Sequence, residues 1–187
     1  GNNIHCTVAG VQMSQAKNWT IDGNTIEQNA TASDMNFVGI NIQTCNDFSS
    51  ISGNKIHMNE RGGIGISTSS YSNSTGVTNI VSIANNEIIS KATVTGKYNI
   101  MIQNSKQMNI YHNSSYIYSH ANIDQSAPIY VSGATSSTNA INIFNNIFYN
   151  ASSSASNKNY AIYLNYTSAT AMAATIKLNN NEYYSAG

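Results

Sequence analysis

One short phrase of apolar and polar positions recurs along this chain: an apolar residue, two spacers, an asparagine, one spacer and a second apolar residue. The complete copies are Ile21-x-x-Asn24-x-Ile26, Ile51-x-x-Asn54-x-Ile56, Ile83-x-x-Asn86-x-Ile88, Ile143-x-x-Asn146-x-Phe148 and Leu178-x-x-Asn181-x-Tyr183. A degenerate copy, Ile110-x-x-Asn113 followed by Ser115, falls where the series predicts one, and Asn2-x-Ile4 matches the end of another. Such repetition predicts a solenoid in which each phrase belongs to one coil.

A second pattern precedes each complete phrase, namely two apolar residues separated by one position. The pairs are Val11/Met13, Ile40/Ile42, Ile64/Ile66, Ile100/Ile102, Ile129/Val131 and Ile162/Leu164. Alternation with a period of two is typical of a strand that is buried on one face. Apolar spacing of three to four residues is scarce and β-branched residues are abundant, which argues against helical repeats.

The segments between the repeated patterns vary in length, because consecutive phrase asparagines lie 27 to 35 residues apart. Stretches rich in Ser, Thr, Asn and Gly, such as Thr68 to Gly76, Gly133 to Asn139 and Ala151 to Asn159, fall in these gaps. We expect them to be turns of different length, which a solenoid tolerates because each coil contacts only its neighbours.

The recurrent asparagine has a structural interpretation. An asparagine in a tight turn tolerates left-handed backbone angles, and its amide both donates and accepts hydrogen bonds. At the strand spacing of roughly 4.8 Å, stacked asparagines can donate to the coil above and accept from the coil below. We therefore predict a structural asparagine ladder rather than a catalytic row, formed by Asn24, Asn54, Asn86, Asn113, Asn146 and Asn181.

The run Gly39-Ile40-Asn41-Ile42, followed by Ile51-Ser52-Gly53-Asn54-Lys55-Ile56, resembles the repeat of right-handed parallel β-helix proteins of the pectate-lyase-like superfamily. The resemblance extends over essentially the whole chain. It implies an all-β fold, a right-handed parallel β-helix of about six coils, in a single domain over residues 1–187 that reads as a segment of a longer protein. The resemblance does not decide the activity, because polysaccharide lyases, glycoside hydrolases, phage tailspikes and bacterial adhesins share this architecture.

Composition narrows the class of protein further. Only 9% of residues are charged, and the formal net charge is +0. Scattered single basic residues give no electrostatic surface for nucleic acid or for anionic membrane, and no apolar run is long enough to insert into one. Asn, Ser and Thr dominate the polar positions, as we expect for an extracellular or cell-surface protein. Cys6 and Cys45 lack metal-type spacing and are predicted to be unpaired thiols.

The ionisable residues form no recognisable catalytic motif. The acids are Asp22, Glu27, Asp34, Asp47, Glu60, Glu87, Asp124 and Glu182, and we expect solvated turn residues at these positions. A two-carboxylate site through Asp22 with Glu27, or Asp47 with Glu60, is the less favoured alternative. The four histidines lack metal-ligand spacing. We therefore assign no catalytic residue, no metal ligand and no cofactor.

The position between the two apolar residues of each first strand should face outward. It holds Gln12, Asn41, Gly65, Met101, Tyr130 and Tyr163, so this row becomes apolar and aromatic toward the C-terminus. Aromatic rings on a sheet surface can bind sugar rings, which predicts carbohydrate binding by Met101, Tyr130, Tyr163 and Tyr166, near Tyr111 and Tyr160. The alternative is that Tyr130 and Tyr163 cover each other as a cross-strand pair.

Two functional hypotheses remain. The first is a non-catalytic module, a stalk or adhesin of a secreted or cell-surface protein, with polysaccharide as a partner. The alternative is a carbohydrate-active enzyme, a polysaccharide lyase or a glycoside hydrolase. In either case the coil edges expose unpaired backbone, so we also expect end-to-end contact with further β-helix coils or with copies of the same chain.

Overall fold

The computed structural model describes residues 1–29, 37–45, 49–59, 63–70, 81–91, 98–105, 107–118, 125–133, 140–152, 158–166 and 168–186. Three parallel sheets contain all the strands of these described residues. Sheet A has seven strands: β1 (Asn3–Cys6), β4 (Thr25–Gln28), β7 (Lys55–Met58), β10 (Glu87–Ser90), β13 (Ser114–Ile117), β16 (Ile147–Asn150) and β20 (Glu182–Ser185). Sheet B has seven: β2 (Ala9–Ser14), β5 (Val38–Gln43), β8 (Ile64–Ser69), β11 (Tyr98–Gln103), β14 (Gln125–Ser132), β17 (Lys158–Asn159) and β18 (Tyr163–Asn165). Sheet C has six: β3 (Thr20–Asp22), β6 (Ser50–Ser52), β9 (Val81–Ala84), β12 (Met108–Tyr111), β15 (Ile141–Phe144) and β19 (Ile176–Asn179).

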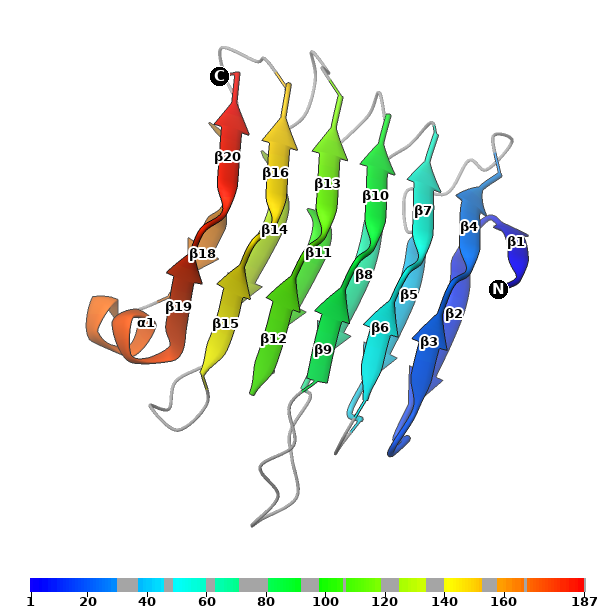
Figure 1. The fold of residues 1–187 in the computed structure, drawn as a ribbon, viewed down its shortest axis with the longest axis horizontal. Coiled ribbons are helices and arrows are strands. Elements are labelled where there is room, and N and C mark those ends of the chain that lie inside the picture. Colours follow the sequence, from blue (N-terminus) through cyan, green and yellow to red (C-terminus); the bar gives the residue numbers. More distant parts are fainter. Residues whose placement is uncertain are drawn as a thin grey trace.

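The chain winds through sheets B, C and A in turn, so that strands three apart in the sequence lie side by side, or four apart in the last coil, where sheet B holds both β17 and β18. Figure 1 shows the strands of sheets C and A running upward in front and those of sheet B running downward behind, while successive coils advance from right to left. This winding is right-handed. The predicted fold class, a right-handed parallel β-helix, is therefore confirmed.

The repeated phrase joins sheet C to sheet A. Its first apolar residue lies in sheet C, where Ile21 pairs with Ile51, Ile51 with Ile83, and the row continues to Leu178. Its second apolar residue lies in sheet A, in a row from Ile26 through Ile56 and Ile88. The phrase recurs because each coil packs its apolar residues against the residues at the equivalent positions of the preceding coil.

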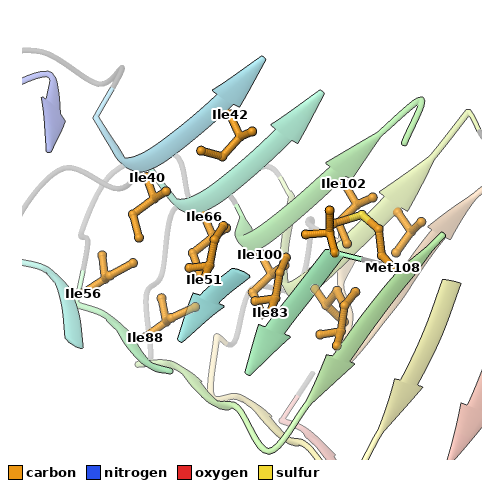
Figure 2. Packing of buried hydrophobic residues seen from close by; sticks show 14 of the residues in the cluster. Ile40, Ile42, Ile51, Ile56, Ile66, Ile83, Ile88, Ile100, Ile102 and Met108 are labelled. Atoms are coloured by element: carbon orange, nitrogen blue, oxygen red, sulfur yellow. The ribbon is translucent and has the colours of Figure 1, made fainter. Parts of the chain in front are cut away.

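Isoleucine side chains fill the interior, and Figure 2 shows them pointing into the space between the sheets. Ile40, Ile42, Ile83 and Ile100 are among the core residues with no exposed surface. Each fully buried side chain of this kind contributes about 1.5–3 kcal/mol relative to an exposed one. The degenerate phrase places Ser115 in the same interior, where its hydroxyl donates to the carbonyl oxygen of Pro128 at 3.2 Å.

Two departures from the predicted elements stand out. The stretch predicted as a turn from Thr68 begins inside β8, where Thr68 is buried, and the predicted turn that ends at Asn159 contains β17. Residues 71–76, 134–139 and 153–157 of the predicted turns lie outside the described residues. A short helix, α1 (Ala169–Thr175), precedes β19, and its Met172 packs against the core. No disulfide joins Cys6 and Cys45, as predicted.

Candidate functional site

The asparagines of the phrase lie one above another at the corner between sheets C and A. Asn24 Nδ2 donates to Asn54 Oδ1 at 3.0 Å, Asn54 Nδ2 to Asn86 Oδ1 at 3.0 Å, and Asn86 Nδ2 to Asn113 Oδ1 at 2.9 Å. The series continues through Asn146 to Asn181 at 2.9 Å for each step. The structure thus brings together all six asparagines of the predicted ladder.

Each ladder side chain also binds the backbone. The main-chain N–H of Asn54 donates to Asn86 Oδ1 at 3.0 Å, and Asn54 Nδ2 donates to the carbonyl oxygen of Ile21 in the preceding coil at 3.0 Å. The same two bonds recur at Asn86, through Asn113 Oδ1 and the carbonyl oxygen of Ile51. Buried polar groups at this corner are therefore satisfied by a side chain from a neighbouring coil, which is a structural role.

The left-handed backbone expected at the ladder asparagines occurs one residue earlier. The residues preceding them have φ between +50° and +66°: Gly23, Gly53, Asn85, His112, Asn145 and Asn180. Glycine and asparagine adopt this conformation at little steric cost. The corner is thus a pair of positions, one residue that turns the backbone and one asparagine that connects the coils.

The outward row of sheet B contains five of its six predicted members. Asn41 pairs with Ser67, Ser67 with Met101, Met101 with Tyr130, and Tyr130 with Tyr163. Gly65 was wrongly placed in this row, because Ser67 occupies the position.

The error at Gly65 has a structural cause. Ile64 pairs with Val38 and is half-buried, whereas Gly65 and Ile66 are both buried. A Cβ atom at Gly65 would lie 2.5 Å from Ile88 Cγ2 of sheet A. Only a glycine allows this close approach, and the alternation of the strand is interrupted there. The inward pair of this coil is therefore Ile66 with Thr68, not Ile64 with Ile66.

The aromatic residues predicted to bind carbohydrate largely cover one another. Tyr130 is only 8% exposed: its ring stacks on Tyr98 at 4.3 Å between centroids and lies 5.1 Å from Tyr163, and its hydroxyl accepts a hydrogen bond from Asn165 Nδ2 at 3.0 Å. Tyr163 also stacks on Tyr160 at 4.6 Å. Burial, followed by the neighbouring tyrosines, raises the pKa of Tyr98 to about 12.

Tyr166 and Met101 differ in their surroundings. Tyr166 packs against the hydrophobic core, and its hydroxyl is buried without a hydrogen-bond partner among the described residues. Burial raises its pKa to about 12. Met101 is half-buried on the outer face of β11. Tyr166 thus does not share a surface with Met101 and the tyrosines of sheet B.

Two further aromatic rows lie on the other sheets and were not identified from the sequence. On sheet A, Tyr149 stacks between Tyr116 and Tyr184, with centroid separations of 4.5 and 4.3 Å. On sheet C, Tyr111 stacks on Phe144 at 5.1 Å. The signal for the first row was present, because each of its tyrosines follows a ladder asparagine by three residues.

The N-terminal half of that row on sheet A holds His5, Glu27 and His57, and Glu87 lies beside it, two residues before Ile89, the residue of β10 that pairs with His57. His5 Nδ1 lies 3.2 Å from Glu27 Oε2, and His57 lies 3.9 Å from Glu27 Oε1 and 3.0 Å from Glu87 Oε1. Glu27 and Glu87 are strand residues, contrary to the prediction that the acids lie in turns. Such exposed pairs contribute about 0–1 kcal/mol each.

Among the described residues, no group of three or more His, Cys, Asp or Glu side chains is arranged to hold a metal ion. In the same part of the chain, no helix is long and apolar enough to cross a membrane.

Comparison with known proteins gives no relative. No family model matches this chain, and neither a curated protein nor a solved structure does. The parallel β-helix is therefore assigned from the structure itself, and membership of the pectate-lyase-like superfamily stays a prediction.

Proposed function

We propose that this chain is a non-catalytic structural module of a secreted or cell-surface protein, a stiff segment of a stalk or adhesin whose side faces contact polysaccharide. The observation that carries the proposal is the ladder, in which every coil from Asn24 to Asn181 is tied to the next by the same side-chain hydrogen bonds. A solenoid with identical connections at each step resists bending and stretching along its axis. Resistance to bending and stretching suits a segment that holds other parts of a protein at a fixed distance.

The outer faces support the second part of the proposal. Stacked aromatic side chains lie on all three sheets in the C-terminal half of the chain. Tyr116, Tyr118 and Tyr184 are 36%, 46% and 46% exposed. Tyrosine combines a large apolar surface with a hydroxyl, which suits contact with sugar rings and their hydroxyl groups.

The test is incubation of the folded chain with a panel of neutral and acidic polysaccharides. Binding is followed by affinity electrophoresis, and the supernatant is assayed for new reducing ends and for unsaturated sugar products. We expect retardation by at least one polysaccharide and no product. Release of product would overturn the non-catalytic assignment and favour the lyase or hydrolase alternative.

End-to-end contact through coil edges stays a prediction. Leu178 and Tyr183 occupy core rows in the last described coil but are 45% and 41% exposed, beside a hollow of about 160 Å³. A further coil, from this chain or from another copy, would bury both side chains. Light scattering of the isolated chain at rising concentration tests the contact between copies, and a constant monomer mass would exclude it.

A further inference from the structure

The tyrosine row on sheet A presents ring edges to the solvent rather than ring faces. Tyr116 and Tyr149 are inclined by 14°, and Tyr149 and Tyr184 by 8°, so each ring covers the face of the next. The three strands that carry them, β13, β16 and β20, lie side by side in front in Figure 1. What this row offers to a ligand is a line of phenol hydroxyl groups.

Tyr118 stands beside this row, just past the end of β13, and one face of its ring is occupied. Its neighbour in the preceding coil is Lys91, because the Tyr118 N–H donates to the carbonyl oxygen of Ser90 at 2.9 Å. Lys91 Nζ lies over the ring, 5.8 Å from its centroid. The Tyr118 ring is 6.0 Å from that of Tyr116 and tilted by 45°, so the two rings do not stack.

Among the described residues, the neighbours of Tyr118 in the following coils are small. Ala151 follows it in the next coil, since the Ala151 N–H donates to the carbonyl oxygen of Ile117 at 2.8 Å, and Ala186 follows Ala151 in the same way. A methyl group is too short to cover an aromatic ring that stands on the sheet. Accordingly, 46% of Tyr118 is exposed.

We propose that Tyr118, Ala151, Ala186 and the hydroxyl edges of Tyr149 and Tyr184 form a binding surface for one pyranose residue of a neutral polysaccharide. The proposal rests on the proposed polysaccharide contact and assigns it to this surface rather than to sheet B. The apolar C–H face of a pyranose packs against the open face of Tyr118, above the two alanines. The sugar hydroxyl groups then meet the phenol hydroxyls beside them.

The chemistry of this surface distinguishes the ligand. Nucleic acid is disfavoured, because the basic residues are few and the formal net charge is +0. The one described cation beside the ring, Lys91, already lies on the far face of Tyr118 and leaves the open face uncharged. A neutral ring with one apolar face and hydroxyl groups at its rim is therefore the fitting partner.

Affinity electrophoresis in gels that contain hydroxyethylcellulose, galactomannan or xylan tests the proposal, with polygalacturonate as the acidic comparison. We expect retardation of the wild type by at least one neutral polysaccharide. Tyr118→Ala should weaken this binding by about tenfold or more. Ala151→Tyr should weaken it equally, because the new ring continues the stack and covers the open face of Tyr118. Val8→Ala, at a side chain that is 49% exposed near the N-terminus, is the control and should bind as the wild type does.

Circular dichroism of each variant establishes that it is folded, which is expected because Tyr118 is exposed and Ala151 is only half-buried. Wild-type affinity in Tyr118→Ala would overturn this surface while leaving the proposed polysaccharide contact intact. Retardation by polygalacturonate alone would overturn the neutral ligand. No retardation in any gel would overturn both this surface and the polysaccharide contact, whereas the non-catalytic assignment is decided separately by the product assay.

Discussion

At the scale of single residues, a ladder asparagine differs from an ordinary buried polar residue because both of its neighbours depend on it. Asn86 Oδ1 accepts hydrogen bonds from the N–H and the Nδ2 of Asn54, and Asn86 Nδ2 donates to the Ile51 carbonyl oxygen and to Asn113. Removal of this amide leaves buried groups without partners in both adjacent coils. Unsatisfied groups of this kind cost about 1–3 kcal/mol each.

We therefore expect Asn86→Leu to lower the free energy of unfolding by roughly 3 kcal/mol or more. The measurement is urea denaturation followed by circular dichroism. The control is Asn109→Leu, because Asn109 lies on the outer face of sheet C and accepts a single described side-chain bond, from Asn142 Nδ2 at 2.7 Å. Equal denaturation midpoints for the two variants would contradict a stabilising role for the ladder.

Tyr166 predicts a dependence of stability on alkaline pH. Its pKa rises from an unfolded value near 10 to about 12 on burial. The neutral phenol is thus favoured in the folded state, and its stabilising contribution is complete below pH 10 and is lost as the pH rises through 12. Between these two pH values the Tyr166 phenol ionises in the unfolded chain but not in the folded chain, and this ionisation stabilises the unfolded state.

Tyr166→Phe should therefore lose less stability than the wild type between about pH 8 and pH 11, as measured by urea midpoints at both values. At the lower pH it should be at least as stable, because the wild-type hydroxyl is buried without a described partner. Tyr118→Phe, at an exposed side chain, is the control and should follow the wild type. A Tyr166→Phe midpoint that falls as steeply as that of the wild type would refute this account.

At the scale of strands, a row of close approaches links sheet B to sheet A. A Cβ atom at Gly39 would lie 2.6 Å from the Gly65 carbonyl oxygen and 2.7 Å from Ile56 Cγ2. The row continues through Gly65, where the obstructing backbone atom is the carbonyl oxygen of Asn99. The backbone of one coil thus fills the space that a side chain of the preceding coil would need.

Gly39→Ala should accordingly reduce stability by about 1–3 kcal/mol, the usual cost of overpacking, with guanidinium denaturation as the measurement. Ala84→Gly, at a buried position outside this row, serves as the comparison for a change of one methyl group. An unchanged midpoint for Gly39→Ala would show that neighbouring coils separate readily to admit a methyl group.

Strand positions that follow from local alternation were predicted correctly, whereas positions that depend on contacts between sheets were not. Inward pairs such as Ile40 with Ile42 follow from alternation alone, and both side chains are fully buried, as predicted. The pair Ile64/Ile66 failed because a close approach between sheets interrupts the alternation, and this approach involves residues distant in sequence. The core contact of Tyr166 could not be predicted for a related reason: Tyr166 follows β18, and nothing in the local sequence pattern indicates that its side chain packs against the core.

At the scale of the whole molecule, each coil is stabilised by its neighbours, so protection from exchange should vary along the axis. Core rows are fully buried at Ile83 and Ile110, whereas Leu178 is 45% exposed. We expect hydrogen exchange to be slowest in β6, β9 and β12 and at least about tenfold faster in β19 and β20. Mass spectrometry of peptides from these strands measures it. Uniform protection would indicate that the chain unfolds only as one unit.

The ladder also gives the molecule a direction. In every described bond between ladder asparagines, from Asn2 to Asn181, the Nδ2 of one coil donates to the Oδ1 of the next coil toward the C-terminus, so these side-chain amide dipoles point the same way. Each is comparable to the roughly 3.5 D of a peptide unit, and aligned units produce opposite partial charges at the two ends of a row. The row of ladder amides taken by itself therefore has a positive end at Asn181 and a negative end at Asn2.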